Sequence, residues 1–182
     1  MNIQAAIAQV VAGQSLSRAD METVMRTVMQ GEATEAQIGG LLVGLRMKGE
    51  TIDEIVGAAS VMRSLATPVN IDTEGLIDLA GTGGDGANLF NVSTAATFVV
   101  AGAGGRIAKH GNRSVSSSSG SSDVLSALGV DLSVSPATIA DCIASIGVGF
   151  MFATMHHSAM KHAIGPRPVS YTHLTLPTKR IV

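Results

Sequence analysis

A glycine-rich run between an apolar segment and a helical one most constrains the fold of this chain. Gly81-Thr82-Gly83-Gly84-Asp85-Gly86 follows residues 76–80, which predict a short buried strand, and precedes residues 93–103, which predict a helix. Glycines at such a turn let an anion approach the amides at the helix start. The run lacks the spacing of a dinucleotide fingerprint or a P-loop. It predicts a strand, loop and helix unit that binds an anion. The alternative is a tight turn that binds no ligand, because such turns are also rich in glycine.

The alternation of strands and helices continues after this unit. Residues 106–108 and 148–153 predict two more strands, and residues 122–128 predict a helix. Ser135-Pro136 opens a further helix with proline at its first position. This order is typical of a parallel sheet covered by helices.

The first 66 residues carry helical signals alone and predict a small helical bundle. A helix behind Ser17 shows apolar residues at helical spacing and has Gly31 at its C-terminal end. Thr34 with Gln37, and Thr51 with Glu54, form two capping-box patterns. The methionine stripe of the first helix fits a buried core face better than an adaptable partner surface: Met21, Met25 and Met29.

Composition restricts the function. The net charge of -2 and the pI near 6.2 argue against a general binder of nucleic acids or acidic membranes. The single Cys142 permits no disulfide framework, the N-terminus lacks a basic signal-peptide region, and no apolar run reaches the length of a membrane span. We therefore expect a cytoplasmic protein with a local anion site and no membrane partner.

Two polar segments follow the glycine run. Asn91, Ser93 and Thr94 stand at a helix start, where such residues cap the helix and also contact a phosphate or a hydrated Mg²⁺. Lys109, His110 and Arg113 then bring three potential cations close together, before the serine-rich residues 114–122. These segments predict a phosphate-rich ligand, with a solvated loop and a low-complexity linker as the alternatives.

The motifs GTGGDG, NVSTA and KHGNRSVSS, in this order and spacing, resemble the anthranilate phosphoribosyltransferase family over nearly all of residues 1–168. The resemblance implies an α/β fold of the nucleoside phosphorylase and phosphoribosyltransferase type, with a small N-terminal helical domain (1–66) and part of a parallel-sheet α/β domain (67–168). Residues 169–182 continue neither the structural pattern nor the family and are expected to be a non-native tail on a truncated chain.

The family resemblance also implies the reaction and its ligands. The phosphoribosyl group of phosphoribosyl pyrophosphate (PRPP) passes to the amine of anthranilate with Mg²⁺ as the cofactor, and members commonly form homodimers through the helical domain. No side chain is predicted to be catalytic, because positioning and charge stabilisation carry the reaction. The implied PRPP contacts are Gly81, Gly84, Asp85, Leu89, Asn91, Val92, Ser93, Thr94, Lys109, His110, Gly111, Asn112, Arg113, Ser114, Val115, Ser116, Ser117 and Ser121. The implied anthranilate contacts are Gly81, Asn112 and Arg167, and the implied metal ligand is Ser93.

Two departures from the family pattern limit this expectation. Ser118 stands where many members carry a lysine, and the acidic pair that completes the family's Mg²⁺ sites is missing, since the adjacent acidic pair here is Asp53-Glu54 in the helical region. We therefore expect this chain by itself to be poorly stable and weakly active or inactive.

Two other classes of protein share part of this sequence pattern. A pyrimidine nucleoside phosphorylase-like enzyme has a related fold and a similar Lys-His-Gly segment, and a non-catalytic relative that binds nucleic acid would need a more basic surface. A metal site at His156-His157 lacks a cysteine or carboxylate at ligand spacing. His157 is instead expected at the surface or in a pocket wall near the acceptor.

Overall fold

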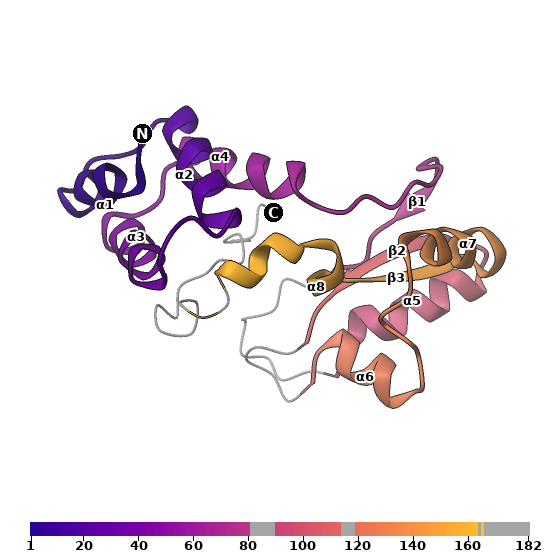
Figure 1. Ribbon diagram of the computed structural model, residues 1–182. Helices are drawn as coiled ribbons and strands as arrows, with labels where there is room; N and C mark the ends of the chain where they lie inside the picture. Colours follow the sequence, from indigo (N-terminus) through magenta and orange to yellow (C-terminus); the bar gives the residue numbers. More distant parts are fainter. Residues whose placement is uncertain (81–89, 114–118, 164, 166–182) are drawn as a thin grey trace. The chain divides into compact units, whose positions relative to one another are not determined.

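The computed structural model describes residues 1–80, 90–113, 119–163 and 165 (Figure 1). They form two compact units, one of residues 1–66 together with the described residues after His156, and one of Thr67–His156. The α/β domain was predicted to run to residue 168. In the structure the chain returns to the helical unit earlier, because the residues after His156 pack against that unit's core.

The helical unit contains α1 (Ile3–Val11), α2 (Arg18–Met29), α3 (Glu35–Lys48), α4 (Ile52–Ser64) and a short 3₁₀ helix, η1 (Ser158–His162). Helix α1 packs on α3, while α2 packs on both α4 and η1. The predicted capping boxes at Thr34 and Thr51 are confirmed, with each threonine and its N3 partner exchanging hydrogen bonds. Local sequence therefore fixes where these two helices begin.

The core of this unit contains the predicted methionine stripe. Met21, Met25 and Met29 are all buried, so the core interpretation is confirmed. Gly57 lets α4 lie close to α2, because a Cβ atom there would stand 2.8 Å from the carbonyl oxygen of Arg18. Any side chain at this position would push the two helices apart.

The second unit is built on a parallel sheet in the order β1 (Leu76–Ile77), β2 (Arg106–Gly111) and β3 (Val148–Phe152). Its helices are α5 (Val92–Gly102), α6 (Ser121–Ala127), α7 (Pro136–Ile146) and the short α8 (Ala153–His156). Ala108 of β2 packs against α7, whereas its neighbour Lys109 contacts α5. Since successive strand residues point to opposite faces, α5 and α7 cover opposite faces of the sheet (Figure 1).

Two strand predictions differ from the structure. The strand predicted at 76–80 pairs with β2 only through Leu76 and Ile77, and Ile77 is 42% exposed. The strand predicted at 106–108 continues to Gly111, so Lys109 and His110 belong to the sheet and not to a following loop. Five residues of β2 have partners in β3, which extends the strand beyond its apolar segment.

Thr67 and His156 are joined where the chain enters and leaves the second unit. The Thr67 amide donates to the His156 carbonyl oxygen at 2.7 Å, and His156 Nδ1 lies 3.0 Å from the Thr67 carbonyl oxygen. These two bonds pin the first and last residues of the unit together. In the described part of the chain, no helix is long and apolar enough to cross a membrane.

Glu54 is a buried carboxylate at the start of α4. It is 1% exposed and accepts hydrogen bonds from the Leu16 amide, the Thr51 amide and hydroxyl, and Lys48 Nζ. Burial opposes its ionisation, but the Thr51 and Leu16 amides and Lys48 together hold the pKa of Glu54 below its ordinary value. Glu54 thus joins the loop before α2 to the start of α4.

Replacing Glu54 with glutamine should destabilise the helical unit by about 3 kcal/mol at neutral pH, because the buried Lys48 ammonium loses its counter-charge. Ionised Glu54 makes its full contribution to the free energy of unfolding above the ordinary carboxyl pKa of about 4.3. This contribution is lost as the pH falls through the lower pKa that Glu54 has in the folded protein. Urea unfolding at pH 7 and pH 3 measures both effects. The exposed Glu50→Gln is the matched control, and equal unfolding midpoints for Glu54→Gln and wild type would contradict the assignment.

Candidate phosphate-binding site

The described part of the predicted site lies where β1 and β2 end and α5 begins. This is the edge at which open α/β sheets bind ligands. The structure describes ten of the predicted residues there: Asn91, Val92, Ser93, Thr94, Lys109, His110, Gly111, Asn112, Arg113 and Ser121. The predictions for nine others concern residues outside the described part of the chain: Gly81, Gly84, Asp85, Leu89, Ser114, Val115, Ser116, Ser117 and Arg167.

Lys109 is the most deeply buried cation of the described residues, with 1% of its surface exposed. Its ammonium donates to the Leu79 carbonyl oxygen at 2.6 Å and to Ser93 Oγ at 3.0 Å. Burial lowers the pKa of Lys109, and the nearby Asp78 carboxylate opposes that shift. An ammonium has three protons, so one remains for a ligand.

The start of α5 presents unfilled donors beside this ammonium. No described residue accepts a hydrogen bond from the Ser93 or Thr94 amide. The hydroxyl of Thr94, a residue that is 3% exposed, also has no hydrogen-bond partner in the described structure. Buried polar groups are normally hydrogen-bonded, and the positive end of the helix dipole adds to their attraction for an anion. The arrangement fits a phosphate group.

Asn91 does not cap α5, contrary to the capping role that the sequence suggested. It occupies the N-cap position without a side-chain hydrogen bond to the helix. Its Nδ2 donates instead to the Ser119 carbonyl oxygen at 3.3 Å, and its Oδ1 accepts from the Ser119 hydroxyl at 3.1 Å. The Gly120 amide then donates to Asp123 of α6 at 2.7 Å. Asn91 therefore links the start of α5 to the segment before α6.

The three predicted cations are not brought together. His110 lies one residue beyond Lys109 in β2, so its side chain points to the opposite face of the sheet. Its amide donates to Asp78 Oδ1 at 3.1 Å, and burial lowers the pKa of His110. Arg113 is exposed, and its amide donates to the Asn112 side chain at 2.8 Å. Of these three cations, Lys109 is therefore the one whose charge lies beside the start of α5.

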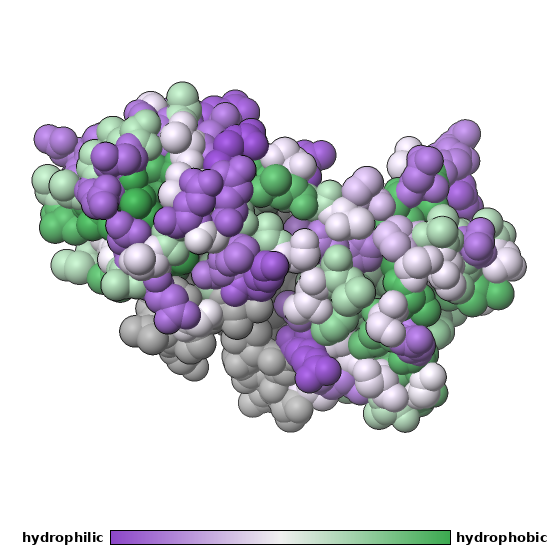
Figure 2. Space-filling model, viewed as in Figure 1, coloured by the Kyte–Doolittle hydropathy of each residue, from purple (hydrophilic) through white to green (hydrophobic). Residues whose placement is uncertain are grey.

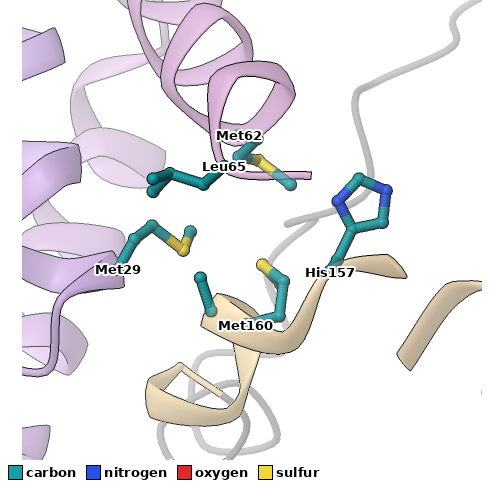
Figure 3. A pocket seen from close by; sticks show the side chains of 6 residues that line it. Met29, Met62, Leu65, His157 and Met160 are labelled. Atoms are coloured by element: carbon teal, nitrogen blue, oxygen red, sulfur yellow. The ribbon is translucent and has the colours of Figure 1, made fainter. Parts of the chain in front are cut away.

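His157 lines a small apolar cavity of the helical unit together with Met29, Met62, Leu65, Ala159 and Met160 (Figure 3). The cavity volume is about 10 Å³, which is at most the room for one water molecule. An aromatic acceptor does not fit there, so this cavity gives no support to the predicted acceptor wall.

The described residues allow only a minor protein contribution to a Mg²⁺ site. Ser93 Oγ accepts from Lys109 and retains one lone pair, which suits a secondary contact to a hydrated Mg²⁺. No group of three or more acidic, histidine or cysteine residues able to hold a metal occurs within the described ranges. Ser93 thus fits a metal that is bound mainly through a phosphate ligand.

Sequence reasoning missed three groups at this site: Asp78, the Leu79 carbonyl oxygen and Ser119. Asp78 interrupts the apolar run at 76–80, and this interruption was the available signal for it. A backbone acceptor leaves no such signal. Ser119 is one of many neighbouring serines, so its particular contact with Asn91 depends on tertiary structure.

The fold and the site together define a glycosyl transferase, and the chain belongs to that family. The helical bundle domain of the glycosyl transferase family matches residues 4–66, and its a/b domain matches residues 73–178. Within the family, the chain is 68% identical over 167 residues to the anthranilate phosphoribosyltransferase of Teredinibacter turnerae and 67% identical to that of Cellvibrio japonicus. These matches cover 92% of this chain and 49% of each relative, so the chain spans about half the length of these relatives.

Solved structures give the same similarity. Anthranilate phosphoribosyltransferase from Thermus thermophilus matches with a TM-score of 0.82 at 41% identity, over 92% of this chain and 51% of that one. The Saccharomyces cerevisiae enzyme in complex with PRPP and Mg matches with a TM-score of 0.83 at 26% identity, over 93% and 51% of the two chains. The sequence-based resemblance and the predicted fold class are confirmed.

Replacing Lys109 with methionine should change the stability of the free protein little, because removing a buried charge offsets the loss of its hydrogen bonds. The same change should abolish stabilisation by pyrophosphate. For wild type, pyrophosphate at 100 times its Kd should stabilise the fold by about 2.7 kcal/mol. Thermal unfolding with and without pyrophosphate measures this, with the exposed Lys161→Met as the matched control. Equal stabilisation of Lys109→Met and wild type would show that Lys109 does not bind the anion.

Proposed function

We propose that the protein transfers the phosphoribosyl group of PRPP to the amine of anthranilate, giving N-(5-phosphoribosyl)anthranilate and pyrophosphate in tryptophan biosynthesis. One observation carries the proposal: the buried Lys109 ammonium lies beside unfilled amide and hydroxyl donors at the start of α5. The similarity to anthranilate phosphoribosyltransferases supports the choice of substrates over a pyrimidine nucleoside phosphorylase activity.

In the proposed reaction, the chain positions the substrates and stabilises the leaving group. Lys109 and the Ser93 and Thr94 donors hold the diphosphate as its bond to the anomeric carbon breaks. The anthranilate nitrogen attacks that carbon, which has oxocarbenium character. As the new C–N bond forms and the bond to the diphosphate breaks, the nitrogen loses one proton to solvent. The chain's part in this step is to orient the acceptor through the predicted contacts Asn112 and Arg167.

We propose Mg²⁺ as the cofactor, bound mainly through the diphosphate with Ser93 as a protein contact. When bound there, it supplies charge neutralisation to the leaving group. The solved yeast relative in complex with PRPP and Mg supports this assignment.

The transfer reaction is tested by the loss of anthranilate fluorescence on addition of PRPP and Mg²⁺, with the chain present at substrate concentration so that slow transfer is detected. We expect product with PRPP and none with ribose 5-phosphate, which lacks the diphosphate. Asn112→Ala should raise the KM for anthranilate about tenfold, as expected for a lost contact of about 1.4 kcal/mol. Phosphorolysis of thymidine without any transfer to anthranilate would refute the proposal.

We also propose a homodimer formed through the helical domain. Three apolar side chains of α1 and α3 are exposed: Val11 (70%), Val43 (42%) and Met47 (84%). Val11 lies against α3, since its Cγ2 would be 3.5 Å from a Cβ on Gly44, so these side chains belong to neighbouring surface of α1 and α3. Figure 2 shows apolar residues gathered where these two helices lie. Such exposed patches favour association.

Substituting glutamate at Val43 and Met47 together should convert the dimer to a monomer, because association would bury two carboxylates without partners. Sedimentation velocity measures the change, and far-ultraviolet circular dichroism checks that the helices persist. Leu128→Glu, at an exposed position on the other unit, is the control. A wild-type chain that sediments as a monomer would refute the dimer.

A further inference from the structure

Asn91 is placed to cap α5 but makes a different contact. As the N-cap residue it would normally accept from an amide of the first turn, as Asn2 does for the Ala5 amide at the start of α1. Its side chain instead pairs with Ser119, which lies 28 positions further along the chain. Helix α5 thus has no side-chain cap, because the Asn91 side chain contacts Ser119 instead.

The contact between Asn91 and Ser119 has two consequences for the phosphate-binding site. The Asn91 amide group binds both the hydroxyl and the carbonyl oxygen of Ser119, so it fixes the backbone as well as the side chain of that residue. The Ser93 and Thr94 amides also stay available, because no capping oxygen occupies them. One contact therefore keeps the helix start open and holds the neighbouring segment beside it.

The contact also extends toward Ser121. The Gly120 amide donates to Asp123, so the residues between Ser119 and α6 are held at both ends. Ser121 is a predicted PRPP contact and the first residue of α6. Asn91 and Ser119 thus join two segments that approach the ligand from different parts of the sequence.

We infer that Asn91 is a positioning residue that acts through Ser119 to couple the start of α5 with the segment before α6 in one phosphate-binding arrangement. The inference rests on the proposed PRPP-binding function and adds to it the residue pair that aligns the site. Asn91 retains one amide proton and one lone pair for a direct ligand contact, so the two roles coexist.

A double-mutant cycle tests the coupling. Ser119→Ala should weaken PRPP binding about tenfold and Asn91→Ala at least as much, measured by titration calorimetry, and the double variant should bind no more weakly than Asn91→Ala. Ser119→Thr keeps the hydroxyl and should bind PRPP as wild type does. Asn2→Ala, which removes a true helix cap in the other unit, should leave binding unchanged. Losses that multiply to about a hundredfold, or lower thermal stability with unchanged PRPP affinity, would overturn the inference.

A second measurement on the ligand-free protein separates this inference from the proposed function. In Asn91→Ala, hydrogen exchange of the Gly120 amide, which donates to Asp123, should become about tenfold faster than in wild type, while exchange at β3 stays unchanged. Unchanged exchange at the Gly120 amide overturns the inference even where wild type binds PRPP. Absence of PRPP binding by wild type refutes the proposed function, and the exchange result then still decides whether Asn91 holds this segment.

Discussion

The burial of one ammonium group organises the phosphate-binding edge of the sheet. Lys109 has almost no contact with solvent, so its protons must find acceptors inside the protein. It finds the Leu79 carbonyl oxygen after β1 and the Ser93 hydroxyl on α5. The same bonds that make the buried charge tolerable therefore fix β2, the end of β1 and the first turn of α5 relative to one another.

The helical unit contains another buried charge, the Glu54 carboxylate, whose hydrogen-bond partners all lie within the protein. Glu54 accepts four hydrogen bonds from Leu16, Thr51 and Lys48, one at Oε1 and three at Oε2, so both carboxylate oxygens have partners within the protein. Its neighbourhood is closed and serves stability. Around Lys109, by contrast, one ammonium proton, the Thr94 hydroxyl and two amides have no acceptor within the described structure. This difference distinguishes a structural ion pair from a site that can take an anion.

Much of the fold could be predicted because its signals are local. Both capping boxes, the methionine core, the start of α7 at Ser135-Pro136 and the parallel sheet agree with the structure. The predictions that were wrong concern the lengths of two strands and one side-chain contact, which depend on pairing between segments that are distant in sequence. β2 extends beyond its apolar segment because β3 pairs with it over five residues, whereas β1 pairs with β2 over two residues only. Asn91 has the residue type of a cap, but Ser119 competes successfully for its side chain.

The sequence by itself determined the family, the order of strands and helices, and the residue types that suit a phosphate, because motifs, helix caps and hydrophobic periods are encoded within short segments. Tertiary structure decided which of those residues act together. The pleat of β2 sends Lys109 toward α5 and His110 to the other face, although the two are adjacent in sequence. The contact between Asn91 and Ser119 exists only because folding brings the start of α5 beside the segment before α6. The reason is physical: hydrogen bonds and burial depend on distances in space, which short segments of sequence do not specify.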